Sequence, residues 1–352
     1  MLHLVDKINY GEADDVLGIK TRDTLRACGV PCECHRIWAT PLTRWLLHAP
    51  FRGRYWLATV LPVKWEWHKF MRQVRAGDVV WVCGSIAPKP ETSCQFERAI
   101  QAKGARYVLH LIDNLFALPE MHAAILARAQ LADAIVVVTP SLQAMVKEVV
   151  PNKPVVLLEE PVDTDRLHRP FAAQEPPQII WTGRPRNIGH VAALAPVLEA
   201  TYRSHAFTLR IVCGSHRPTL ALNIPWEWMP YYPEKEGSYY QASRAGIAFF
   251  EDTPYNQCKG NYKVKTMLAA GVPVITTPVG YNHVLIKPGE TGFLVRTPAE
   301  WAQSLKTLLT NAALAKAMGL AARQDMLQRY SHRMLMPVWR DALNKLSPAE
   351  KP

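Results

Sequence analysis

Short apolar segments rich in Val, Ile and Leu alternate along the chain with longer segments of helical character. Uninterrupted apolar strands between helices are typical of parallel sheets that helices cover on both faces. We predict strands at residues 3–5, 79–83, 107–112, 134–138, 155–159, 178–182, 208–212, 246–250, 272–276 and 292–295. Helices are predicted at residues 16–28, 93–103, 119–129, 141–149, 189–201, 262–270 and 298–310.

A polar, proline-rich stretch at residues 169–177 interrupts this alternation, and a new apolar strand follows it at once. Such a stretch is typical of a linker. We therefore expect an N-terminal domain over residues 1–168 and a second α/β domain over residues 178–325, with a ligand cleft between them. Residues 326–352 have helical composition with a break at Pro337, and we expect them to return to the first domain.

The composition is that of a soluble globular protein, with 49% hydrophobic and 20% charged residues in 352. It excludes a disordered chain, a collagen-like repeat and a disulfide miniprotein. The seven cysteines show no zinc spacing and indicate reduced thiols. No apolar run is long enough for a signal peptide or a membrane span, so we expect a cytoplasmic protein, either free or peripheral on the inner face of the plasma membrane.

Positive charge is concentrated at residues 36–75, where eight Lys and Arg accompany one Glu and five of the eleven tryptophans. On a helix over residues 63–75, Trp67, Phe70 and Val74 share an apolar face and the basic residues share another. Two interpretations stay open: the patch binds an anionic membrane surface, or its apolar face packs on the sheet of its own domain. We expect no nucleic-acid partner, because no recognition motif accompanies the charge.

Candidate chemistry lies at residues 249–282, where a predicted strand leads through an acidic loop to a short helix. Lys259 precedes this helix and Lys263 lies in its first turn. Lysines there add charge to free backbone N–H groups and to the positive end of the helix dipole, which together favour an anion. The sequence shows neither a nucleophile elbow, nor a Walker loop, nor a dinucleotide-binding fingerprint after its first strand.

The ordered motifs resemble GT-B glycosyltransferases of family 4, also called group 1, of the bacterial surface-polysaccharide type. After Lys263 the chain reads AAG, VPV and TPVGYN, and PGETGFLV follows at residues 288–295. Upstream, IIWTGR at residues 179–184 resembles the strand and turn that open the nucleotide-binding domain. Residues 132–141 and 160–167 resemble two further family segments. The resemblance implies two Rossmann-like domains with parallel sheets that face a central cleft, and a C-terminal helix that crosses back.

The resemblance also implies a nucleotide-diphosphate sugar as donor, held without a metal or other cofactor. Arg184 and Lys263 would contact the diphosphate and stabilise charge on the leaving nucleotide. Arg186 and Lys259 are further phosphate candidates. The remaining nucleotide or sugar contacts would be Gly183, Thr266, Gly280, Tyr281 and Asn282.

This chain departs from the family at two positions where many relatives carry glutamate, here Cys258 and Thr266. Thr266 could offer a hydroxyl to the ribose, and Glu251 or Asp252 could replace the missing acid near the sugar. On the acceptor side, Asp113 could contact the acceptor or act as base, and a helix-capping role is the alternative. Further acceptor-side candidates are Tyr10, Glu12 and Asn114, whereas His110 is expected in the core.

The activity implied is a hexosyltransferase, retaining by family resemblance, that uses a saccharide or lipid-linked acceptor in cell-surface polysaccharide or glycolipid synthesis. Two alternatives stay open. One is a sugar-nucleotide epimerase or hydrolase on the same fold. The other is a non-catalytic GT-B module that binds nucleotide sugars and docks on membranes.

Overall fold

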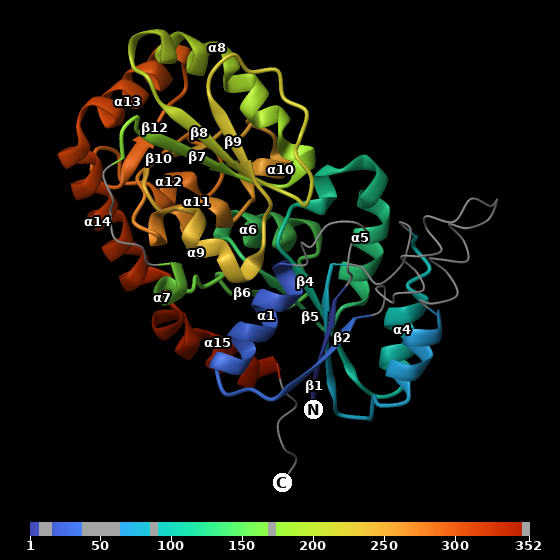
Figure 1. Ribbon diagram of the computed structural model, residues 1–352. Coiled ribbons are helices and arrows are strands. Elements are labelled where there is room, and N and C mark those ends of the chain that lie inside the picture. The colour runs from blue at the N-terminus through green and yellow to red at the C-terminus, as the bar shows by residue number, and fades with distance from the viewer. Residues whose placement is uncertain (7–15, 37–63, 85–90, 168–173, 347–352) are drawn as a thin grey trace. The chain divides into compact units, whose positions relative to one another are not determined.

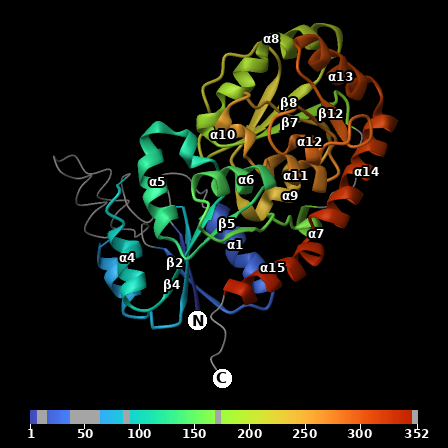
Figure 2. The same ribbon diagram turned by 180° about the vertical axis from the view of Figure 1, so that it is seen from behind.

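The computed structural model describes residues 1–6, 16–36, 64–84, 91–167 and 174–346. Contacts within the chain divide it into two compact units (Figure 1; Figure 2 gives the opposite view). Unit 1 comprises Met1–Glu159 and Met336–Pro352, and unit 2 comprises Glu160–Leu335. Each unit contains one six-stranded sheet, and all the strand pairs among the described residues are parallel. The predicted fold class, two α/β domains with parallel sheets, is confirmed.

The sheet of unit 1 has the strand order β2-β1-β3-β4-β5-β6. Its strands are β1 (Leu2–Asp6), β2 (Cys32–Arg36), β3 (Val79–Cys83), β4 (Arg106–Leu111), β5 (Ala134–Val137) and β6 (Val155–Leu157). Its helices are α1 (Val16–Ala27), a helix at residues 64–71, α4 (Gln95–Ala102), η1 (Leu115–Ala117), α5 (Pro119–Leu131) and α6 (Pro140–Val149). The sequence did not predict β2, because Cys-Glu-Cys-His-Arg is polar and lies at the edge of the sheet, where burial is incomplete.

The sheet of unit 2 has the order β12-β11-β10-β7-β8-β9. Its strands are β7 (Gln178–Thr182), β8 (Thr208–Val212), β9 (Trp226–Met229), β10 (Ser243–Ala248), β11 (Val274–Thr276) and β12 (Gly292–Leu294). Its short helices are α7 (Thr164–Leu167), η2 (Pro185–Asn187), η3 (Pro233–Lys235), α9 (Glu236–Tyr239), α10 (Pro254–Gln257) and α12 (Asn282–Leu285). Its longer helices are α8 (Gly189–Ser204), α11 (Tyr262–Ala269), α13 (Pro298–Thr310) and α14 (Ala312–Arg329). The edge strand β9, half-buried throughout, was also not predicted.

The core of unit 2 lies on both faces of this sheet. On one face, α8 and α13 contribute Leu198 and Leu305 to a cluster that includes Ile179 and Ile247 of the central strands. On the other face, Gly246 of β10 leaves the space that Met267 of α11 fills. Helices therefore cover both faces of the sheet, and the loops at the carboxyl ends of its strands stay at its edge.

The apolar face of the helix at residues 64–71 packs inside unit 1, which was the second of the two interpretations. Trp67, Phe70 and Met71 are buried, and the ring of Trp67 lies 4.9 Å from that of Phe96 on α4. Trp65, on the opposite side, is 73% exposed. The rest of the predicted patch, up to residue 63, lies outside the described residues. Within the described chain, no helix is both long and apolar enough to cross a membrane.

The division between the units differs from the expected domain boundaries. Residues that follow Glu159 already pack in unit 2, because Val162 pairs with Ser331 and the carbonyl of Thr164 accepts a hydrogen bond from Arg323. The helix break expected at Pro337 lies instead between α14, which ends at Arg329, and α15 (His332–Leu346). Pro337 is the sixth residue of α15 and lies within it, so it lacks the N–H group that would donate to the carbonyl of Arg333.

From Met336 onward, α15 belongs to unit 1. The indole of Trp339 stacks on Trp81 of β3 with 6.1 Å between ring centroids, and its Nε1 donates to the carbonyl of Glu159. The C-terminal segment therefore returns to the first unit.

Candidate functional site

The loops that follow β7, β8 and β10 lie along one edge of the sheet in unit 2. Thr182 at the end of β7 pairs with Val212 at the end of β8, and β10 runs parallel to β7 on its other side. Ligands of open parallel sheets bind beyond this carboxyl edge. The predicted residues Gly183 and Arg184 follow β7 directly, so they lie where such a ligand would bind.

The turn after β7 contains a glycine, so a ligand can approach its backbone closely. A Cβ atom at Gly183 would lie 2.5 Å from the ring of Trp181, so only glycine fits there without a shift. Across the turn, Gly214 has a φ of +49°, and a Cβ there would lie 2.5 Å from Pro185. Arg184 is half-buried with extended backbone, whereas Arg186 is exposed. The local sequence therefore fixes Arg184 more tightly than Arg186.

Lys263 is the second residue of α11, and its Nζ atom lies against aromatic rings. It is 4.5 Å from the ring centroid of Phe250 and 5.6 Å from that of Trp181. Among the residues that the structure describes, no carboxylate forms an ion pair with it. Burial, and secondly the charge of Lys259, lower the pKa of Lys263 to about 7. An anion that binds beside this partly buried ammonium would stabilise its charged form.

His190 lies beside these lysines and was not predicted as a site residue. It occupies the first turn of α8, and burial together with the charges of Lys263 and Lys259 lowers its pKa to about 4. Its Nδ1 atom is buried and has no hydrogen-bond partner within the described part of the chain. Two cations and a neutral imidazole thus meet near the N-termini of α8 and α11, which favours a phosphate group. In the sequence, the only signal for His190 as a site residue is its position six residues after Arg184, in the first turn of a predicted helix.

Three predicted nucleotide or sugar contacts have their polar groups engaged within unit 2. The hydroxyl of Thr266, a residue 1% exposed, donates to the carbonyl of Lys263 and accepts from Tyr240. Asn282 is fully buried, and its amide contacts Thr276, Thr277 and Asn261. Tyr281 is buried too, with its hydroxyl beside that of Tyr330. These side chains therefore support the site through their packing and hydrogen bonds within unit 2, and their polar groups are not directed to a ligand.

The predicted acidic loop after β10 is exposed. The carboxylate of Asp252 accepts a hydrogen bond from Gln257, and the carbonyl of Glu251 accepts one from Asn256. The same Gln257 accepts from the backbone of Gly280, whose φ of +57° suits glycine. Hydrogen bonds of Gln257 therefore connect the acidic loop to the turn at Gly280. Cys258, at the first position where many family members have glutamate, is buried.

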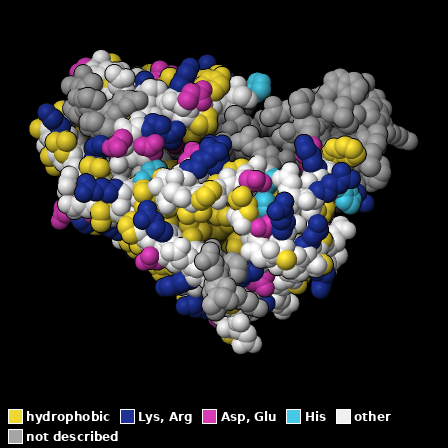
Figure 3. Space-filling model, turned by 90° about the horizontal axis from the view of Figure 1, so that it is seen from below, with side chains coloured by type: hydrophobic (Ala, Val, Ile, Leu, Met, Phe, Trp, Pro, Cys, Tyr) yellow, Lys and Arg dark blue, Asp and Glu magenta, His cyan; other side chains and the backbone are white. Residues whose placement is uncertain are grey.

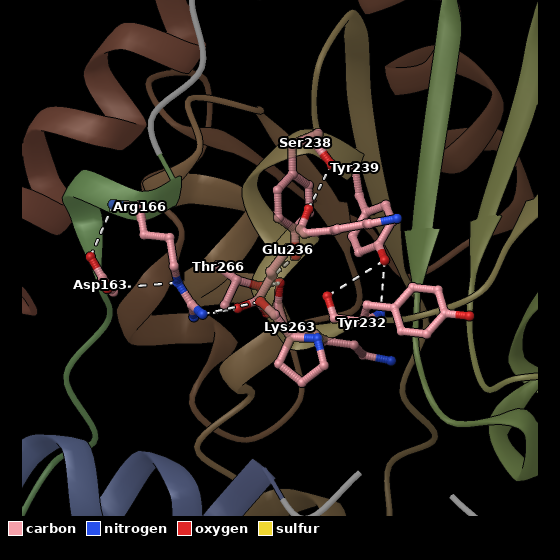
Figure 4. Close-up of polar contacts among 11 residues, drawn as sticks. Asp163, Arg166, Tyr232, Glu236, Ser238, Tyr239, Lys263 and Thr266 are labelled. Atoms are coloured by element: carbon pink, nitrogen blue, oxygen red, sulfur yellow. Dashed lines mark hydrogen bonds and ion pairs between the residues drawn. The ribbon is translucent and has the colours of Figure 1, made fainter. Parts of the chain in front are cut away.

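The segment after β9 forms the other side of this region and was not predicted. Arg166 of α7 holds it, since its guanidinium donates to Glu236 and to the carbonyl of Pro233 and lies near Asp163 (Figure 4). Tyr232, 41% exposed, lies at the start of the segment. Helix α7 contacts both α9 and α11, so this segment lies near α11.

The predicted acceptor-side residues lie in unit 1. Asp113 follows β4 and is half-buried, and its carboxylate makes no hydrogen bond or ion pair with other described residues. The N-cap of η1 is Asn114, without a side-chain cap bond, so Asp113 does not cap this turn. His110 is buried in the core as expected, beside Trp81 and Cys83. Tyr10 and Glu12 lie outside the described residues.

Comparisons with known proteins agree with this geometry. The family model "Glycosyl transferases group 1" matches residues 176–311, which include most of the site in unit 2. The chain resembles sucrose-phosphate synthase from Thermosynechococcus elongatus, with a TM-score of 0.70, 14% identity, and 98% of this chain and 99% of that one covered. It also resembles HepE from Anabaena in complex with UDP and glucose, with a TM-score of 0.67, 12% identity and coverage of 98% and 100%.

TarM from S. aureus, solved in complex with UDP among other ligands, is similar over a smaller part. The TM-score is 0.63 at 14% identity, and the match covers 79% of this chain and 58% of TarM. No curated protein sequence matches the chain. The chain therefore has the GT-B fold of these glycosyltransferases, and its residues 176–311 match the Glycosyl transferases group 1 family.

Proposed function

We propose that this protein is a glycosyltransferase that moves a sugar from a nucleotide-diphosphate sugar to a saccharide or lipid-linked acceptor. The observation that carries the proposal is Lys263, a half-buried ammonium at a helix N-terminus and at the carboxyl edge of a parallel sheet. The family match of the same region supports a nucleotide-sugar donor. HepE, solved with UDP and glucose, supports the same donor class for this fold.

In this proposal the cations act on the diphosphate. Lys263 and Arg184 contact the phosphate oxygens, and Lys259 adds positive potential from beside the helix. When the bond between sugar and phosphate breaks, negative charge grows on the leaving diphosphate. Cations fixed before the reaction stabilise this charge without reorganisation, which is how preorganised electrostatics lower a barrier. His190, neutral at pH 7, offers a hydrogen-bonding ring instead of a third charge.

The segment after β9 is proposed to receive the nucleoside. Tyr232 is an exposed aromatic side chain on a segment held by Arg166, and an aromatic ring is a suitable surface for a base to stack on. The hydroxyl of Thr266 donates to the carbonyl of Lys263 and accepts from Tyr240, so we do not assign it to the ribose.

Glu251 and Asp252 remain the proposed acids near the donor sugar, and Asp113 the proposed acceptor contact or base. Retention of the anomeric configuration, a role in surface polysaccharide or glycolipid synthesis, and a donor chemistry without metal are proposed from family resemblance. Two buried non-acidic residues, Cys258 and Thr266, stand where many relatives have glutamate, and they favour the non-catalytic binding module as second candidate.

The test is calorimetric titration with UDP, GDP and ADP and with their hexose conjugates. Replacing Lys263 or Arg184 by alanine should weaken binding at least about tenfold, since charge-assisted hydrogen bonds contribute about 1.5–3 kcal/mol. Lys306→Ala, on the exposed part of α13, is the matched control and should bind like the parent. Unchanged affinity in both site variants would refute the phosphate assignment.

Turnover separates the enzyme from its alternatives. Incubation of the preferred nucleotide sugar with candidate acceptors should yield a glycosylated product and free nucleoside diphosphate. Binding without any product would favour the non-catalytic module. A free sugar or an epimerised donor in the absence of acceptor would favour the hydrolase or epimerase.

Peripheral membrane binding is proposed on charge alone. Lys64 and Lys69 are exposed on the helix at residues 64–71, and Arg72 and Arg75 are exposed just after it. These cations can attract an anionic surface while the apolar face of the helix stays buried. Figure 3 shows Lys and Arg side chains dispersed among acidic and apolar ones over the face it displays. Pelleting with liposomes should require anionic lipid and weaken with salt, and equal pelleting on neutral vesicles would contradict it.

A further inference from the structure

A group of three side chains on the edge of the sheet in unit 1 has no role in the proposed transfer. Strand β1 pairs in parallel with the edge strand β2, and His3 is the register partner of Glu33. His35 follows two residues later on the same face of β2. Two histidines and one carboxylate from paired strands therefore lie side by side.

The potential ligand atoms are close enough to share one ion. His3 Nδ1 lies 3.1 Å from His35 Nε2 and 3.6 Å from a carboxylate oxygen of Glu33, which is 3.7 Å from His35 Nε2. In a tetrahedral zinc site with bonds of about 2.0–2.2 Å, two ligand atoms lie roughly 3.3–3.6 Å apart. The observed triangle is within a few tenths of an ångström of that geometry.

A second carboxylate orients the first histidine. His3 Nε2 lies 3.2 Å from Asp78, whose carboxylate also accepts from the backbone N–H of Arg75 and from the N-terminal ammonium. Donation from Nε2–H to Asp78 leaves the lone pair of Nδ1 directed at His35 and Glu33. Metal-binding histidines usually donate their second N–H to a carboxylate, a backbone carbonyl or a water molecule, and Asp78 is such an acceptor.

Packing holds both rings in place while one side stays accessible. The ring of Phe70 lies 4.5 Å from that of His35 and 5.7 Å from that of His3. His3 is buried and the side chain of Glu33 is half exposed, so an ion could enter past the carboxylate.

We propose that His3, Glu33 and His35 bind one divalent transition-metal ion, Zn²⁺ by preference, with a water or an exogenous ligand in the fourth position. Two imidazoles and one carboxylate are a set that suits zinc. The ion would tie the edge strand β2 to β1. The residues belong to unit 1 and include none of those proposed for the donor, so the metal is not part of the transfer chemistry proposed above.

The experiment uses the full chain with a cleavable C-terminal tag, stripped of metal and titrated with Co²⁺ and then Zn²⁺. Co²⁺ should bind at one equivalent with the intense visible bands of tetrahedral coordination, and Zn²⁺ should displace it. Glu33→Gln and His35→Gln should each weaken Co²⁺ binding at least about tenfold, and Asp78→Asn about 10–100-fold. His68→Gln, which replaces an exposed histidine outside the cluster, should leave the Co²⁺ affinity unchanged.

Melting curves of the metal-free variants check that each is folded. Zn²⁺ should raise the melting temperature of the parent and of His68→Gln but not of Glu33→Gln, whose exposed position makes misfolding a poor explanation. The absence of tetrahedral bands in the parent would overturn the proposal. Equal Co²⁺ affinity in the parent and both ligand variants would overturn it too. Neither result would bear on nucleotide-sugar binding.

Discussion

Replacing Lys263 by methionine should stabilise the ligand-free protein while it weakens donor binding. Burial, and secondly Lys259, lower the pKa of Lys263 from its ordinary value of 10.5 to about 7. The unfolded chain therefore binds a proton here more tightly than the folded chain does. Each tenfold difference in proton affinity corresponds to about 1.4 kcal/mol, so the charged lysine lowers the free energy of unfolding by at most roughly 5 kcal/mol.

This contribution has a defined pH dependence. Below pH 7 the lysine is charged in both states and its full cost applies. Between pH 7 and 10.5 the folded protein has lost the proton and the unfolded chain has not, so the cost declines as the pH rises. The gain in unfolding free energy from Lys263→Met should therefore be largest near pH 6 and small near pH 10.

Urea unfolding at pH 6, 8 and 10, followed by circular dichroism, measures this difference. Lys306→Met, which removes an exposed lysine from α13, is the control and should change stability little at any of these pH values. A gain from Lys263→Met that is equal at pH 6 and pH 10 would refute the argument from burial. So would a loss of stability at pH 6.

Three further results are expected. Affinity for a nucleotide sugar, whose diphosphate keeps its charge over this range, should fall as the pH rises from 7 to 9 and Lys263 loses its proton, and Lys263→Arg should flatten that dependence in calorimetry. Glu97→Ala should lower the free energy of unfolding in urea by about 3–5 kcal/mol, because it leaves the fully buried Arg128 without its 2.9 Å partner. Gly319→Ala should lower the melting temperature, at a cost of about 1–3 kcal/mol, because the new Cβ atom would meet the carbonyl of Gly271.

The sequence predicted the central strands of both sheets and two of the four edge strands, β6 and β12, but it missed the other two, β2 and β9. Central strands such as β3 and β7 are apolar throughout, and their burial in the structure is complete. The edge strands β2 and β9 contain polar and aromatic residues, because one side of an edge strand needs no burial. Missing β2 also hid the juxtaposition of His3 with Glu33 and His35.

Site residues divide in a similar way. Lys263 and Arg184 could be found because motifs place them at a helix start and after a strand. Tyr232 could not be found, since its position depends on packing between segments distant in sequence, and His190 could have been found only from its place in the first turn of α8. Thr266 and Asn282 were predicted from the same motifs, but their side chains form hydrogen bonds inside the core of unit 2.

The discontinuous composition of unit 1 has a consequence for biosynthesis. Its last helical turns come after Met336, so they leave the ribosome only after the whole of unit 2 has emerged. Until then the indole of Trp81 lacks the ring of Trp339 that covers it. Unit 2 is one continuous segment and can fold during translation, whereas unit 1 can complete its core only after residues 336–346 have also been synthesised.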